Sequence, residues 1–125
     1  MSESNFYKQL KTNTPQVLWT RIENRHGGGI PDLNGLYEGH DFWVELKITT
    51  TNKVRLSPTQ ISWHYNRSSH GGKSFILVKN TKTKEIKLFG NSTVRLLAGD
   101  GFETDSIVTL KPPYNWSLLV CHFRP

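Results

Sequence analysis

The segment that most constrains the fold is residues 30–48, which reads IPDLNGLYEGHDFWVELKI. Two strand-like stretches flank a short turn that contains a glycine, a pattern typical of a β-hairpin. Side chains alternate between two faces along a strand, so Phe42, Val44 and Leu46 share one face of the second stretch. We expect this apolar face to lie in the core and the opposite face, with Glu45 and Lys47, to hold the charges.

The turn decides which residues of the two strands lie opposite each other. With residues 38–39 as the turn, Asp32 lies across from Glu45, and with residues 39–40 it lies across from Lys47. Both registers leave Asp32, Glu45 and Lys47 on one face. Directly opposed residues have Cβ atoms about 4.5–5.5 Å apart, so two opposed carboxylates are close enough to share a cation.

A pair of carboxylates beside a lysine suits the hydrolysis of a phosphodiester bond. Carboxylate oxygens hold Mg²⁺ and leave the other octahedral positions to water and phosphate oxygens. The metal polarises the phosphate and activates a bound water, while an ammonium group stabilises the developing charge. We therefore predict Asp32 and Glu45 as ligands of Mg²⁺ or Mn²⁺, with Lys47 as the charge partner. The alternative is a surface hairpin with ordinary charges.

The composition favours a polyanionic partner. The 125 residues include 16 Lys and Arg against 10 Asp and Glu, a formal net charge of +6. This excess suits DNA or RNA, although a basic protein without such a partner would carry the same charge. No apolar run approaches the roughly 18 residues of a membrane span, and the N-terminus lacks the pattern of a secretory signal. We expect a single cytoplasmic domain with no membrane partner.

Cysteine and histidine usage argues against a zinc site. Cys121 is the only cysteine, which excludes an internal disulfide and a cysteine-based zinc cage within one chain. Its apolar neighbours predict a buried, structural thiol. The five histidines are scattered without metal-ligand spacing and are mostly expected at the surface, with His26 placed to contact phosphate from the glycine loop.

The rest of the chain alternates helical and strand-like segments. Residues 17–23 are predicted as a strand, with a short helix as the alternative, and residues 74–79 as a strand buried on both faces. The C-terminal tail is expected to be structural, with Trp116, Leu119 and Val120 packing on the sheet. Helices are expected at residues 3–12, 58–68 and 91–99, and further strands at residues 31–37, 41–48, 85–89 and 106–110.

Gln60 has two interpretations. Ser57 is a favourable N-cap, Pro58 suits the first helical position, and Gln60 stands where it completes a capping box. The functional alternative places its amide at the DNA backbone or the metal site. Local rules by themselves favour the cap.

Four segments in order, GGGIPDLNG, FWVELK, LSPTQISWH and GGKSFILVK, resemble the PD-(D/E)XK nuclease superfamily. They are most similar to its VRR-NUC and Holliday-junction-resolvase-like branch, which includes small phage-encoded members. The resemblance covers residues 21–79, about half of the chain. It implies an α/β fold with a restriction-endonuclease-like core, in which helices flank a mixed central sheet, and a single nuclease domain over residues 1–125. A phage-type protein, acting in a bacterial or phage-infected host cell, is expected.

The resemblance also implies an activity and its residues. Asp32, Glu45 and Lys47 match the catalytic set, and Gln60 matches a supporting glutamine at the following helix. The implied enzyme is a metal-dependent DNA endonuclease, structure-specific for a Holliday junction or a flap, and a homodimer. Many relatives place one more acidic residue upstream, for which we prefer Glu23 over Glu3 because Glu23 faces the loop that delivers Asp32.

Basic residues on both sides of the predicted site are candidates for contacts with the DNA backbone, which would make binding salt-dependent. A solvated basic face is the alternative for each of them. Two other hypotheses concern the whole chain, namely a non-catalytic DNA- or RNA-binding module of the same fold and a basic structural protein of a nucleoprotein complex. Both predict that the carboxylates are dispensable. The candidate DNA contacts are Arg21, Arg25, His26, Lys53, Arg55, Arg67 and Lys73.

Overall fold

The computed structural model describes residues 1–23 and 28–125. Its strands are β1 (Leu18–Arg21), β2 (Leu33–Tyr37), β3 (His40–Thr49), β4 (Ser74–Asn80), β5 (Ile86–Gly90) and β6 (Val108–Leu110). Its helices are α1 (Glu3–Asn13), α2 (Pro58–Ser69), α3 (Val94–Asp100) and α4 (Trp116–Val120). Short 3₁₀ turns lie at η1 (Asn91–Thr93), η2 (Gly101–Glu103) and η3 (Cys121–Phe123). Arg25 and His26 lie outside the described residues.

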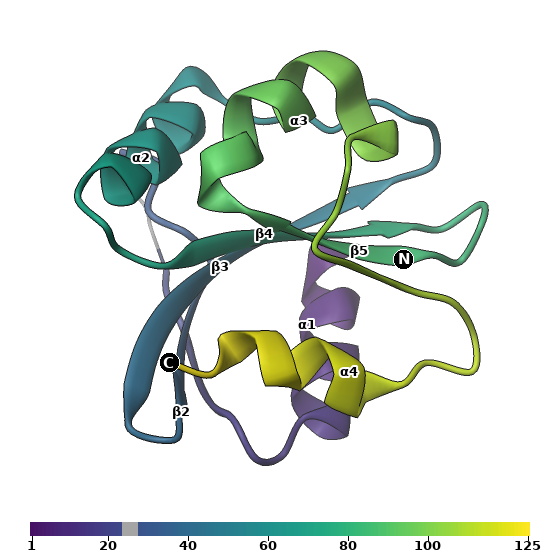
Figure 1. The fold of residues 1–125 in the computed structure, drawn as a ribbon. Helices are drawn as coiled ribbons and strands as arrows, with labels where there is room; N and C mark the ends of the chain where they lie inside the picture. Colours follow the sequence, from purple (N-terminus) through teal and green to yellow (C-terminus); the bar gives the residue numbers. More distant parts are fainter. Residues whose placement is uncertain (24–27) are drawn as a thin grey trace.

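The strands form one six-stranded mixed sheet between two layers of helices. Their order in the sheet follows the sequence, and neighbours are antiparallel except for β3 and β4, which run parallel. Helices α2 and α3 cover one face of the sheet, and α1 and α4 cover the other (Figure 1). Because parallel strands need a crossover connection, α2 lies between β3 and β4 in the chain. The expected α/β fold, a mixed sheet flanked by helices, is confirmed.

The hairpin of β2 and β3 adopts the first of the two possible registers. Tyr37 pairs with His40 across a two-residue turn, in which Glu38 has φ 51° and Gly39 has φ 74°. Two positive φ angles characterise the tight turns that match the twist of a hairpin. Continuing this register by one pair beyond β2 aligns Asp32 with Glu45.

Two other local predictions are confirmed. β1 is a strand paired with β2, so the helical alternative for residues 17–23 is wrong. α2 begins with a capping box, because the Ser57 side chain accepts from the Gln60 backbone and the Gln60 side chain accepts from the Ser57 backbone.

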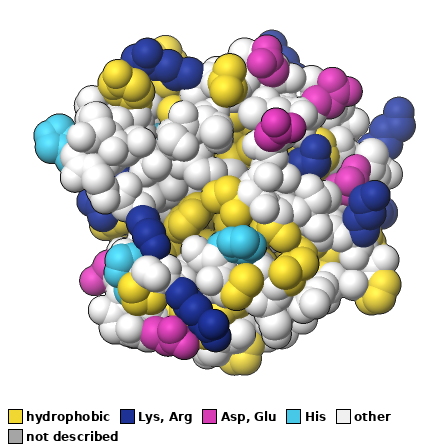
Figure 2. All heavy atoms as spheres, viewed as in Figure 1, with side chains coloured by type: hydrophobic (Ala, Val, Ile, Leu, Met, Phe, Trp, Pro, Cys, Tyr) yellow, Lys and Arg dark blue, Asp and Glu magenta, His cyan; other side chains and the backbone are white. Residues whose placement is uncertain are grey.

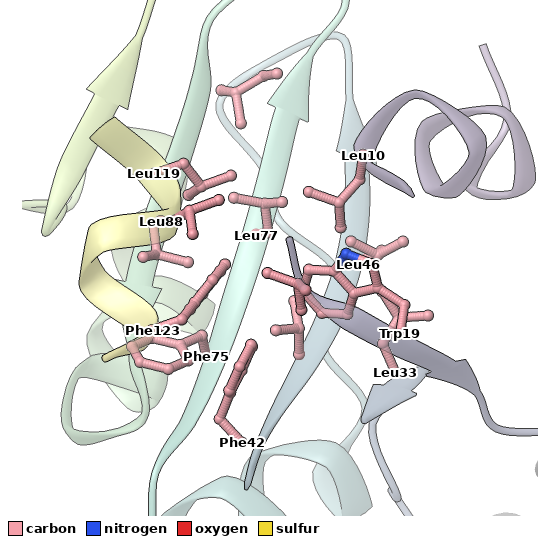
Figure 3. Close-up of a cluster of buried hydrophobic side chains, with 14 of the residues drawn as sticks. Leu10, Trp19, Leu33, Phe42, Leu46, Phe75, Leu77, Leu88, Leu119 and Phe123 are labelled. Carbon is pink, nitrogen blue, oxygen red and sulfur yellow. The ribbon is translucent and has the colours of Figure 1, made fainter. Parts of the chain in front are cut away.

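The larger core lies between the sheet and the layer of α1 and α4. Figure 3 shows its central side chains, which come from all parts of the chain. Phe42 is fully buried and stacks on Phe123, with ring centroids 4.3 Å apart and planes at 13°. Trp19 and Phe75 meet Phe42 edge to face. The C-terminal tail therefore completes this core, as expected.

A smaller core lies on the other face, where Ile76 and Val78 pack against α3 and the segment after it. All residues of β4 are buried, which confirms the predicted burial of this strand on both faces. No helix within residues 1–23 and 28–125 has the length and apolarity needed to cross a membrane.

The prediction of a buried Cys121 is wrong, and one histidine departs from the general expectation for histidines. Cys121 is exposed, although the residues on both sides of it, Val120 and Phe123, are buried. The α4–η3 turn points those neighbours at the core and leaves the thiol outside, where Sγ donates to the Leu118 carbonyl. The histidines were mostly expected at the surface, but His64 is fully buried on the inner side of α2.

The buried His64 predicts an acid-sensitive stability. Its Nδ1 lies 2.8 Å from Ser74 Oγ, and its Nε2 has no hydrogen-bond partner among the residues that the structure describes. Burial lowers the pKa of His64 from 6.5 to about 4. The unfolded chain therefore binds the proton more readily, so the free energy of unfolding falls as pH drops from 6.5 to 4, by up to about 3 kcal/mol from this residue. Urea unfolding between pH 4 and 7.5 should show a shallower decline for His64→Asn than for the wild type. Parallel declines would contradict the assignment.

Candidate active site

Asp32 is positioned by backbone contacts at the end of β2. Its carbonyl accepts from the Ile22 N–H at 2.7 Å, and its Oδ2 accepts from the Leu46 N–H at 2.9 Å. β2 begins at Leu33, so the edge of β3 beyond Val44 has no backbone partner on that side. The Leu46 N–H lies on this edge, and the Asp32 carboxylate accepts a hydrogen bond from it. This bond fixes the Asp32 side chain against β3.

Glu45 is the most strongly perturbed carboxyl of the site. It is 2% exposed, and its Oε1 has no hydrogen-bond partner in the described part of the chain. Burial, a side-chain hydrogen bond with Asp32 and the Asp32 charge together raise the pKa of Glu45 well above its usual range, and Lys47 opposes them only in part. Without a cation, these effects favour the protonated form of Glu45 beside Asp32.

Glu3, at the first turn of α1, joins these residues. Burial raises the pKa of Glu3, the Lys47 charge lowers this pKa, and the Asp32 charge raises it. Both charged side chains therefore lie close to Glu3. Glu3 also lines two adjoining pockets, one of about 380 Å³ with Lys47 and one of about 40 Å³ with Asp32. The structure thus brings Glu3 to the site, which the preference for Glu23 did not anticipate. A metal-binding role of either glutamate stays a prediction.

The basic candidates divide into two groups. Lys53 and Arg55 line the larger pocket, and Arg21 lines the smaller one, where its guanidinium lies 5.4 Å from the centroid of the Tyr7 ring. The sequence placed Tyr7 on a face of the predicted N-terminal helix but gave it no role at the site, because that helix could not be positioned relative to β1. These contacts bring three cations to the pockets around the carboxylates.

Two other basic candidates line neither of these pockets. Lys73 donates to the carbonyl of Arg124 at 2.8 Å, away from both pockets. Arg67 packs against two tryptophans on α2 and β3. The face seen in Figure 2 mixes charges of both signs and gathers acidic side chains over α3, so the surface over α3 is unsuited to a phosphate backbone.

Gln60 has the capping role that local rules favour. Its Oε1 accepts from the Ser57 N–H at 2.9 Å. The loop before Asp32 packs against this same end of α2, since a Cβ on Gly29 would lie 2.1 Å from the Thr59 carbonyl oxygen. Gly29 also has φ +75°. The loop that delivers Asp32 is therefore held against the start of α2, and a further role of Gln60 at a substrate stays a prediction.

The residues fit a divalent cation held by Asp32 and Glu45. The buried, partnerless Oε1 of Glu45 and the adjacent Asp32 carboxylate supply the hard oxygen ligands of Mg²⁺, which commonly takes one or two carboxylates and keeps water or phosphate in its other positions. Protein side chains alone would not complete the coordination of the metal, because no group of three or more His, Cys, Asp or Glu among the described residues could hold a metal ion.

Solved structures share this fold. One is Hjc, a Holliday junction resolvase from the archaeal hyperthermophile Archaeoglobus fulgidus, with a TM-score of 0.56 and 14% identity over 73% of this chain and 74% of that chain. Another is described as a VRR_NUC domain, with a TM-score of 0.50 and 19% identity over 78% of this chain and 94% of that chain. No family model and no curated protein matches the sequence. The likeness concerns the fold, and it agrees with the restriction-endonuclease-like core that the sequence resemblance implied.

Proposed function

We propose that the chain is a metal-dependent DNA endonuclease, with residues 1–125 acting as one nuclease-like domain. The observation that carries this proposal is the carboxylate pair. Asp32, one residue before β2, lies beside Glu45 of β3, and one buried oxygen of Glu45 has no hydrogen-bond partner among the described residues. A purely structural hairpin gains nothing from two carboxyls at one buried point, because burial and mutual repulsion both destabilise the charged forms.

The chain's own residues suit the steps of phosphodiester hydrolysis. A Mg²⁺ or Mn²⁺ ion held by Asp32 and Glu45 would polarise the phosphate and lower the pKa of a water molecule. The Lys47 ammonium would stabilise negative charge that develops on the phosphate. Lys53 and Arg55 line the same pocket as Lys47 and would hold the neighbouring DNA backbone without reading its sequence.

The resolvase-like fold supports a structure-specific substrate, a Holliday junction or a flap. Resolving a junction needs two cuts on two strands, so this substrate implies a homodimer with two active sites. We also propose a phage-type origin and a cytoplasmic place of action, in a bacterial or phage-infected host cell, where DNA intermediates of this kind form.

The proposal is tested by cleavage of a four-way junction, a flap, a linear duplex and single-stranded DNA. The wild type should cleave the junction or the flap in Mg²⁺ or Mn²⁺, should be inactive in EDTA, and should lose about a hundredfold or more of its rate on Asp32→Asn. The solution mass of the protein, alone and with the junction, tests the dimer.

Equal cleavage by the wild type and Asp32→Asn would contradict this active site. Binding without cleavage of any substrate would favour a non-catalytic nucleic-acid-binding module. Loss of DNA binding by Lys53→Ala, together with unchanged DNA binding by Asp32→Asn, would also favour the non-catalytic binding module.

A further inference from the structure

Two tryptophans and an arginine form a cluster on the α2 side of the sheet, beside the candidate active site. Trp43 of β3 and Trp63 of α2 meet edge to face, with ring centroids 5.7 Å apart. The Arg67 guanidinium lies 6.0 Å from the Trp43 centroid and 5.6 Å from the Trp63 centroid. Gly72 packs on the other side of Arg67, where a Cβ would lie 2.6 Å from Nε. The arginine is therefore held in place before any ligand binds.

The charge of Arg67 is not neutralised within the described residues. Within residues 1–23 and 28–125, its buried Nε has no hydrogen-bond partner and no carboxylate forms an ion pair with its guanidinium. An arginine held by aromatic rings and lacking an anion has free donors for a phosphate group. The net charge of +6 reinforces the attraction of such a ligand.

The cluster lies along the same face of β3 as the carboxylates. Trp43 precedes Glu45 by two residues and pairs with Asn34, next to the position where Asp32 aligns with Glu45. Two residues of a strand span about 6.6 Å, a length that one or two nucleotides of a DNA strand cover. A strand bound at Glu45 therefore reaches Trp43 with the adjoining nucleotide.

One residue of the cluster, Trp63, also lines a groove beside α2. Trp63 lines this groove of about 290 Å³ together with Thr59, Ser62 and Asn66, and none of the described residues that line it is acidic. On the same sheet face, Leu18 of β1 is 64% exposed, so α2 leaves the outer strands open to a ligand. Hydroxyl and amide groups beside an aromatic ring suit a nucleobase and its sugar.

We propose that Trp43, Trp63 and Arg67 form a subsite for an unpaired nucleotide next to the cleaved phosphate. Trp63 stacks on the base, Trp43 supports it, and Arg67 pairs with the phosphate. Bases inside a duplex already stack on each other, so an aromatic ring on the protein binds the face of a base that has left the duplex. The subsite rests on the proposed function and narrows its substrate class to DNA with unpaired bases beside the cut.

Binding measured in EDTA separates this subsite from catalysis. We would compare, by fluorescence anisotropy, a labelled duplex with a single-stranded flap and the same duplex without one. The wild type should prefer the flapped duplex. Trp63→Leu, which keeps apolar bulk but removes the ring, should weaken binding of the flapped duplex about 5- to 100-fold and abolish the preference, while Trp63→Phe should retain most of it. Arg67→Gln should weaken binding of the flapped duplex.

Tyr65 provides a matched control. It is an aromatic residue on the same helix, 46% exposed and stacked by Arg95 at 4.0 Å rather than facing Trp43. Tyr65→Leu should bind both DNAs as the wild type does. An unchanged preference in Trp63→Leu, or an equal loss in Tyr65→Leu, would overturn the subsite. Glu45→Gln separates the two proposals. If this variant still prefers the flapped duplex, but neither it nor the wild type cleaves DNA, the nuclease proposal fails and the nucleotide subsite stands.

Discussion

Replacing Glu45 by glutamine should lower the rate of Mg²⁺-dependent DNA cleavage by about a thousandfold or more, with little effect on folding. The amide cannot carry the negative charge that holds a divalent cation beside Asp32. In the metal-free protein, however, Glu45 is 2% exposed and its raised pKa favours the protonated form. Glutamine has the shape of this neutral form, so the free energy of unfolding should change by less than about 1 kcal/mol.

Three measurements check this expectation. Cleavage assays give the rate, urea unfolding gives stability, and calorimetric titration with Mn²⁺ gives metal affinity. Because the metal must displace the Glu45 proton, the affinity of the wild type for Mn²⁺ should rise with pH, and binding should release a proton. Glu103→Gln, an exposed glutamate beyond the site, is the control and should behave as the wild type. Cleavage by Glu45→Gln at the wild-type rate would exclude Glu45 from the active site.

Replacing Phe42 by alanine should lower the free energy of unfolding by about 3–5 kcal/mol, the usual cost of removing a buried phenyl ring. Phe42 is fully buried, stacks on Phe123 and meets Trp19 and Phe75 edge to face. Its loss leaves a cavity at the point where β1, β3, β4 and the C-terminal tail meet. The cavity also undermines β3, the strand that presents Glu45.

Urea unfolding at neutral pH measures this loss. Leu118→Ala is the matched control, because Leu118 is an apolar residue of α4 that is 43% exposed, and its truncation should change stability by no more than about 0.5 kcal/mol. A Phe42→Ala protein within about 1 kcal/mol of the wild type would mean that the stack with Phe123 does not secure the tail.

The hairpin of β2 and β3 shows which structural features the local sequence pattern could predict and which it could not. Alternation along β3 correctly separates the apolar face with Phe42 from the face with Glu45, because strand geometry fixes that period. The register stayed open, since residues 38–39 and residues 39–40 could each form the turn. The positive φ of Glu38, an uncommon conformation for a residue with a side chain, is what the sequence pattern could not establish.

Side-chain environment was harder to predict than element type. Cys121 has apolar neighbours in the sequence, yet the direction of the α4–η3 turn leaves it exposed. His64 is polar, yet it lies on the inner side of α2 and pairs with Ser74. In both cases the rotation of a helix about its axis against the sheet decides burial, and composition around one residue does not reveal that rotation.

By itself, the sequence determined the hairpin, the capped helix α2, the doubly buried strand β4 and the charged residues Asp32, Glu45 and Lys47 on one strand face. These features depend on periods and turn chemistry within short segments. Only the tertiary structure decided that Glu3 lies near Asp32 and Lys47. It also decided which basic residues line the surrounding pockets, namely Arg21, Lys53 and Arg55. Arg67 instead packs against Trp43 and Trp63. The physical reason is that these neighbours come from separate elements, whose relative positions follow from packing on both faces of the sheet.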